Sequence, residues 1–113
     1  MKTTRLVTTD IELIKDAVAR GLWFSIKNAR GSCVYLTPAK VLRLAKSQYG
    51  GVVTRSVVRH VLDELAKRGY IEFIQRTTRK EYVYCIHRGM QLWSFIKQCN
   101  GPEDVRLLLD RIV

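Results

Sequence analysis

The segment from residue 54 to residue 87 constrains the fold more than any other part of the chain. TRSVVRHVLDELAKR has the apolar period of an amphipathic helix, with Val58 and Leu62 on its inward face. Thr54 is a favourable N-cap, and Gly69 is a favourable residue for ending the helix. Two β-prone runs, YIEFIQ and EYVYCIH, then flank the polar and basic connection RTTRK. The pattern predicts a helix followed by a β-hairpin with an exposed tip.

Upstream of this unit, the sequence predicts two more helices and a strand region. Thr9 and Glu12 have the spacing of a capping box, and the helix that starts there is expected to end at Gly21. LWFSIK is apolar and partly alternating, and CVYLT is a short β-prone run, so the strand region is expected here. Thr37 followed by Pro38 is an N-cap with proline at the first helical position, which predicts a second helix through AKVLRLAKS.

Two short helical patterns are expected after the hairpin. The first contains Leu92, Trp93 and Ile96, and the second starts after Gly101 and Pro102. No repeat or low-complexity linker interrupts the chain, so we expect a single domain over residues 1–113, with a core at 10–87 and a helical extension at 88–113. The apolar stripes of the extension are wide for a small domain, which predicts a homodimer formed through these helices. The expected fold class is α+β, mainly α.

The chain is strongly basic, and the positive charge is concentrated in one region. The formal net charge of the 113 residues is +10. Residues 1–16 are neutral, residues 17–62 carry eight cations and no acid, and residues 63–113 carry nine cations and seven acids. Such an excess favours a polyanionic partner, of which nucleic acid is the usual one. An anionic membrane surface and a merely basic protein without such a partner are the alternatives.

Other classes of protein lack support in the sequence. The cysteines Cys33, Cys85 and Cys99 are widely spaced and have no zinc-type partner pattern, so we expect no metal, no cofactor and free buried thiols in a reducing cytoplasm; one disulfide remains an alternative. The first ten residues lack the apolar stretch of a signal peptide, and no apolar run is long enough to span a membrane. With two histidines, scattered acids and no glycine-rich phosphate loop, the sequence predicts no enzyme.

Three segments resemble the winged helix-turn-helix family. They are VYLTPAKVLRLAKS for the first strand and helix, QYGGVV for the turn, and TRSVVRHVLDELAKRGYIE for the recognition helix and its exit. The order of elements is similar to that of MarR-type and ArsR-type regulators and of small archaeal winged-helix proteins. The resemblance implies a winged helix-turn-helix with a β-hairpin wing and extra C-terminal helices. It also implies sequence-specific binding of double-stranded DNA, with the helix at about 54–68 in the major groove and a basic wing at 76–80.

The charges at the helix starts support a related expectation. Acidic residues are favourable near a helix N-terminus. The first and last expected helices have them, whereas the second starts with Lys40 and the third with Arg55, without an acid. A phosphate docked at each of these two starts would supply the missing negative charge. The alternative is that these long side chains simply bend into water.

The candidate DNA contacts follow from the resemblance and from these charges. On the third helix, Arg55 or Arg59 is expected to bind a guanine edge, which a bidentate arginine can recognise. The exposed residues of that helix are expected to be Thr54, Arg55, Ser56, Arg59, His60 and, one turn further, Asp63. The wing-tip contacts are expected to be Arg76, Thr77, Thr78, Arg79 and Lys80, and the phosphate contacts on the second helix Lys40, Arg43 and Lys46.

Transcriptional regulation in the cytoplasm, in association with the nucleoid, is the expected role. Two alternatives stay open at this stage. One is an architectural or RNA-associated winged-helix protein that works by charge and shape. The other is a protein-interaction module inside a replication or transcription assembly.

Overall fold

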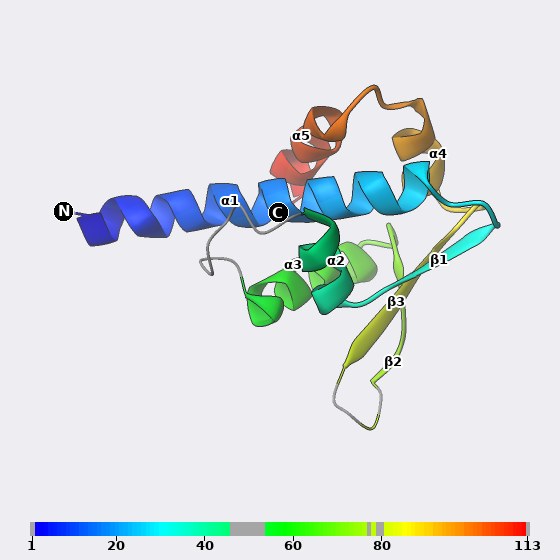
Figure 1. The fold of residues 1–113 in the computed structure, drawn as a ribbon, viewed down its shortest axis with the longest axis horizontal. Helices are drawn as coiled ribbons and strands as arrows, with labels where there is room; N and C mark the ends of the chain where they lie inside the picture. Colours follow the sequence, from blue (N-terminus) through cyan, green and yellow to red (C-terminus); the bar gives the residue numbers. More distant parts are fainter. Residues whose placement is uncertain (1, 46–53, 77, 79–80, 113) are drawn as a thin grey trace.

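The computed structural model describes residues 2–45, 54–76, 78 and 81–112, and it has an α+β, mainly helical fold (Figure 1). In chain order, the elements are α1 (Lys2–Lys27), β1 (Cys33–Leu36), α2 (Pro38–Ala45), α3 (Arg55–Lys67), β2 (Glu72–Arg76), β3 (Tyr82–His87), α4 (Gln91–Gln98) and α5 (Pro102–Ile112). The predicted α+β class is therefore confirmed. The described helices and strands are compatible with a winged helix.

The three strands form one antiparallel sheet in the order β1-β3-β2. Cys85 in the central strand lies opposite Tyr35 of β1 on one side and opposite Glu72 of β2 on the other. The β2–β3 ladder has an irregularity between Phe73 and Gln75. In Figure 1 the β2–β3 hairpin extends away from the helices, and we call this hairpin the wing.

The first helix differs from the prediction at both ends. It runs from Lys2 to Lys27, through the expected start at Thr9 and through the expected stop at Gly21, so LWFSIK is helical rather than a strand. The reason is burial, because Leu22 and Ile26 continue the helical spacing into the core and are fully buried. Burying such side chains outweighs a glycine cost of about 1 kcal/mol in a helix.

The sequence predicted the caps of the second and third helices correctly. The backbone N–H of Lys40 donates to Thr37 Oγ1 at 3.1 Å, and Pro38 is the first residue of α2. Thr54 caps α3. Gly69 follows the end of α3 with φ +82°, a left-handed conformation that glycine adopts without strain.

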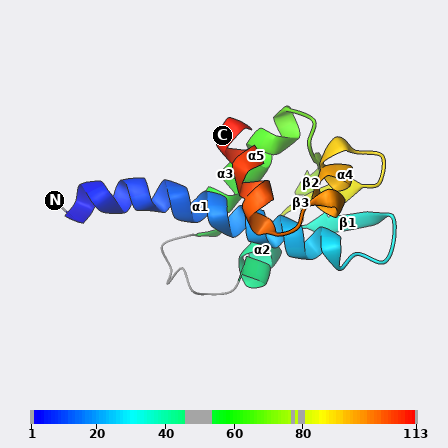
Figure 2. The same ribbon diagram turned by 90° about the horizontal axis from the view of Figure 1, so that it is seen from above.

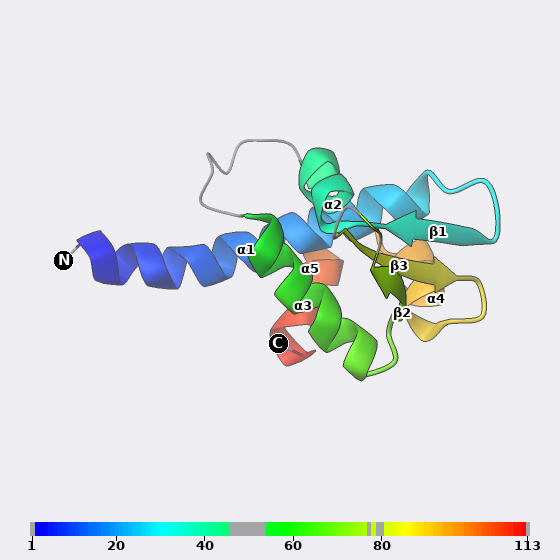
Figure 3. The same ribbon diagram turned by 90° about the horizontal axis from the view of Figure 1, so that it is seen from below.

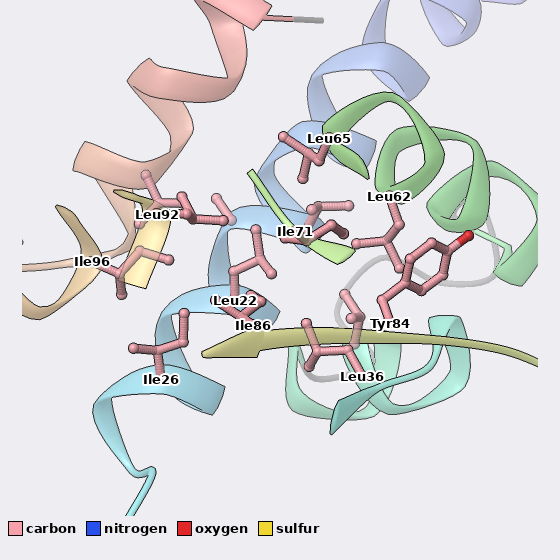
Figure 4. Packing of buried hydrophobic residues seen from close by; sticks show 14 of the residues in the cluster. Leu22, Ile26, Leu36, Leu62, Leu65, Ile71, Tyr84, Ile86, Leu92 and Ile96 are labelled. Carbon is pink, nitrogen blue, oxygen red and sulfur yellow. The ribbon is translucent and has the colours of Figure 1, made fainter. Parts of the chain in front are cut away.

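One hydrophobic core joins all five helices to the sheet. α1 packs against α2 and α5, and its first turns extend beyond the other elements in two perpendicular views (Figures 1 and 2). Figure 4 shows where the centre of the core lies, between Leu22 of α1, Leu62 of α3, Ile86 of β3 and Leu92 of α4. The core therefore fixes the start of α3 relative to the wing, which is where the candidate site lies.

Candidate nucleic-acid interface

A pocket of about 400 Å³ lies where the starts of α2 and α3 meet the wing. Figure 3 shows how α2, α3, β2 and β3 are arranged. Two small residues of α2 form one wall. Its lining consists of Pro38, Ala39, Arg55, Ser56, Arg59, Arg76, Glu81 and Tyr82. Three arginines and one glutamate give the pocket a net positive charge. Ser56 of α3 and Arg76 of β2, 20 positions apart in the sequence, both line it because the wing folds back beside α3.

The start of α3 is open to solvent. Thr54, Arg55 and Ser56 are all exposed, and Thr54 Oγ1 accepts a hydrogen bond from the backbone N–H of Val57 at 3.5 Å. The first backbone N–H groups of a helix have no partner within the helix. No ion pair is found for Arg55 among the described residues. The helix end and this guanidinium are therefore available to an anion from outside the chain.

Arg59 is held in place by two neighbours. Its guanidinium lies 4.6 Å from the centre of the Tyr82 ring, and its Nε lies 3.9 Å from Asp63 Oδ2. Asp63 is itself fixed, because the hydroxyl of Tyr84 donates to its Oδ1 at 2.5 Å. Burial, together with this hydrogen bond, raises the pKa of Tyr84 above its ordinary value, so the hydroxyl stays protonated as a donor. This chain of contacts fixes the direction in which Arg59 points.

The wing supplies a second cation to the same aromatic ring. The guanidinium of Arg76 lies 5.5 Å from the centre of the Tyr82 ring. Because Arg59 uses this ring as well, Tyr82 gathers two like charges at one side of the pocket. An anion bound there would reduce their mutual repulsion.

The structure brings four of the expected contacts together and leaves others apart. Arg55, Ser56, Arg59 and Arg76 line one pocket. Lys40 instead donates from Nζ to the carbonyl oxygen of Tyr35 at 3.0 Å and lines a different pocket. The remaining described candidates, Arg43, Thr54, His60 and Thr78, are exposed. The candidates Lys46, Thr77, Arg79 and Lys80 lie outside the described residues.

The expectation that the first helix starts with acidic residues was wrong. Asp10 and Glu12 lie in the middle of α1, because that helix begins at Lys2 and has no acid in its first turn. α4 also begins without an acid, so within the described residues only α5 has acids in its first turn. The absence of acids therefore does not single out α2 and α3. What singles out the start of α3 is its exposure and its position in a basic pocket.

Sequence reasoning missed the aromatic support of this site. Tyr82 and Tyr84 were assigned no role, and Asp63 was expected to be exposed, whereas it is half-buried and bonded to Tyr84. A signal was present in EYVYCIH, since alternate residues of a strand share a face. Both tyrosines lie on the face that packs against α3.

Residues 2–45, 54–76, 78 and 81–112 contain no group of three or more His, Cys, Asp or Glu side chains that could hold a metal ion. Among the same residues, no helix is both long and apolar enough to cross a membrane. No protein-family model matches the chain, and the comparisons with curated proteins and with solved structures found no significant match.

Proposed function

We propose that the chain is a winged-helix protein that binds double-stranded DNA sequence-specifically and regulates transcription in association with the nucleoid. The observation that carries the proposal is the basic pocket, in which the open start of α3 and a wing arginine face the same space. An α-helix fits the major groove of B-DNA, where base edges present a distinctive pattern of donors and acceptors.

Arg55 is the proposed base-contacting residue. It is exposed at the first position of α3, and no ion pair holds it among the described residues. Arg59 lies one turn further along and is pre-oriented by Tyr82 and Asp63, so it loses less freedom on binding. Ser56, between them, contacts a phosphate or a base. Arg55 thus supplies recognition of guanine, while Arg59 supplies a fixed positive charge beside it.

The wing and α2 supply contacts to the DNA backbone in this proposal. Arg76 is the last residue of β2, and arginine is favoured in narrow minor grooves. Arg43 is exposed on α2 and approaches a phosphate. Lys40 can contact a phosphate only after its hydrogen bond to the carbonyl oxygen of Tyr35 is broken. Such contacts position the protein without reading sequence.

Selection from random duplex DNA, followed by binding measurements on the selected site, tests the proposal. Wild-type protein should enrich a discrete motif containing guanine. Arg55→Ala should lose about 1–3 kcal/mol of discrimination at that guanine, a factor of roughly 5 to 150. Arg88→Ala removes an exposed arginine that follows β3, outside both this pocket and the pocket between α4 and α5, and serves as the control. Failure to enrich any motif would contradict sequence-specific binding.

Architectural binding by charge and shape is the second candidate. Arg30 and Lys40 line a separate pocket beside β1, so positive charge continues beyond the start of α3. A protein of this kind would coat DNA or RNA through its backbone. Footprinting distinguishes the two candidates, since a regulator protects a discrete site and an architectural protein does not.

We also propose a homodimer formed through α4 and α5. Leu107 is 60% exposed and Phe95 38% exposed, and both line a pocket of about 350 Å³ between these helices. A two-fold dimer would place two α3 helices on two half-sites of one duplex. Sedimentation at micromolar concentration should give the mass of a dimer, and Leu107→Glu should give a monomer that stays folded. A wild-type monomer would contradict this part of the proposal.

A further inference from the structure

Two of the three cysteines lie side by side on the sheet, on the face opposite the core. Cys33 opens the edge strand β1, and Cys85 lies in the central strand β3, 52 positions later in the sequence. Their Sγ atoms are 2.7 Å apart. All three cysteines are free thiols. The third one, Cys99, lies at the end of α4, where its thiol donates to the carbonyl oxygen of Phe95 at 3.1 Å.

We propose that Cys33 and Cys85 are a dithiol–disulfide site that a glutathione-type disulfide oxidises. The bond would join β1 to the wing strand β3. A protein disulfide has an S–S length of about 2.05 Å, so the sulfur atoms need to approach by only about 0.7 Å. The two positions are diagonal neighbours in the ladder, because Cys33 lies opposite His87 while Cys85 lies opposite Tyr35. The side chains nevertheless converge, so the native sheet presents the pair ready for bonding.

The surroundings assign different roles to the two thiols. Cys33 is half-exposed and lines a pocket of about 380 Å³ together with Arg30 and Lys40. These cations attract an oxidised glutathione molecule, whose carboxylates outnumber its ammonium groups. Cys85 is buried, and burial, followed by the hydrogen bond with Cys33, raises the pKa of its thiol to about 12. Cys33 is therefore the attacking thiol, and Cys85 is the resolving thiol.

The chemistry is a two-step exchange in which atoms and electrons balance. The Cys33 thiolate attacks one sulfur of oxidised glutathione, which forms a mixed disulfide and releases one glutathione thiolate. Cys85 then loses its proton to water and attacks Cys33 Sγ, which breaks the mixed disulfide and releases the second glutathione thiolate. The two protein thiols are oxidised to one disulfide, and one oxidised glutathione is reduced to two thiols.

Equilibration of the full chain with mixtures of oxidised and reduced glutathione tests the assignment. After alkylation, mass spectrometry should show that two of the three thiols become protected together. Before alkylation, the oxidised protein should be lighter than the reduced protein by two hydrogens and carry no glutathione adduct. A peptide pair linked through Cys33 and Cys85 should appear after proteolysis. The melting temperature of the oxidised form should rise by roughly 10 °C, because the bond closes a long loop in the unfolded chain.

Single substitutions distinguish a disulfide between Cys33 and Cys85 from other oxidation products of the three thiols. Cys99→Ser should leave the protection unchanged. Cys85→Ser should accumulate the glutathione adduct on Cys33, since the resolving thiol is gone, and Cys33→Ser should abolish the protection while leaving the fold intact. Three free thiols at every glutathione ratio, or a bond through Cys99, would overturn the assignment. A lower melting temperature on oxidation would also overturn it, because the bond would then not form in the native sheet.

Discussion

Among single residues, Gly21 sets how closely α1 and α2 approach each other. A Cβ atom at this position would lie 2.6 Å from Val41 Cγ1 and 2.9 Å from the carbonyl oxygen of Val41. Backbone cannot move aside as a side chain can, so Gly21→Ala should lower the free energy of unfolding by about 1–3 kcal/mol, even though alanine favours a helix. Urea unfolding followed by circular dichroism measures the change.

Gly31→Ala is the matched control, because no atom beyond the two adjacent residues lies within 4 Å of the Cβ position there. This variant should unfold within about 0.5 kcal/mol of the wild type. Equal stability of the two alanine variants would show that the approach of α1 to α2 does not depend on Gly21.

Gly21 also shows why the residue type alone did not predict where the first helix ends. Glycine at the end of an apolar helical pattern predicted a stop, whereas its role here is close packing against Val41. The two roles need the same residue type, and only the position of α2 distinguishes them. Gly69, by contrast, was predicted correctly, because the cap it forms depends on the residues next to it.

At the scale of whole elements, ion pairs join the last helix to the first. Lys15 Nζ lies 3.4 Å from Asp110 Oδ1, Arg106 also pairs with Asp110, and Arg106 pairs with Glu12, 94 positions away. Local patterns predicted α4 and α5, since capping and apolar spacing are properties of adjacent residues. They did not predict these contacts, because charges that meet across two helices leave no periodic signal in the sequence.

The pairing of Asp110 predicts a loss of stability in acid. Desolvation alone would raise the pKa of Asp110, but hydrogen bonds from Arg106 and Lys15 outweigh it and hold the pKa below its ordinary value of about 3.9. A carboxylate whose pKa is lower in the folded state stabilises that state above the unfolded pKa. This contribution is lost as the pH falls through the folded pKa.

Asp110→Asn isolates this contribution. The variant should be less stable than the wild type at pH 7, and the difference should shrink as the pH falls below about 4. Thermal unfolding at several values between pH 3 and pH 7 measures it. In 1 M salt the difference at pH 7 should also shrink, since exposed ion pairs are screened. A difference that stays constant across this pH range would rule out a role for the charge of Asp110.

At the scale of the whole molecule, the sequence predicted the fold class and the basic region, but not how the arginines are arranged. The charge count placed eight cations without an acid in residues 17–62. The structure places four of these cations in two pockets, with Arg55 and Arg59 in one and Arg30 and Lys40 in the other. The two pockets are separate because the wing folds beside α3. A count of charges along the chain cannot predict this arrangement.

The proposed roles of Arg43 and Arg55 predict different effects on how DNA affinity depends on salt concentration. Each phosphate that a cation neutralises contributes about 0.9 to the slope of log affinity against log salt concentration. If Arg43 contacts a phosphate, Arg43→Ala should reduce the slope by about 0.9 and weaken the binding of all duplexes alike. Arg55→Ala should leave the slope nearly unchanged and weaken only duplexes that carry the selected guanine, because a base contact displaces no condensed counterion. Titrations of a selected and a scrambled duplex at 50 and 200 mM salt measure both quantities. The proposed roles are contradicted if Arg55→Ala lowers the affinity for both duplexes equally and also reduces the slope. Arg55 would then be a phosphate contact, and the protein would bind DNA as an architectural protein does.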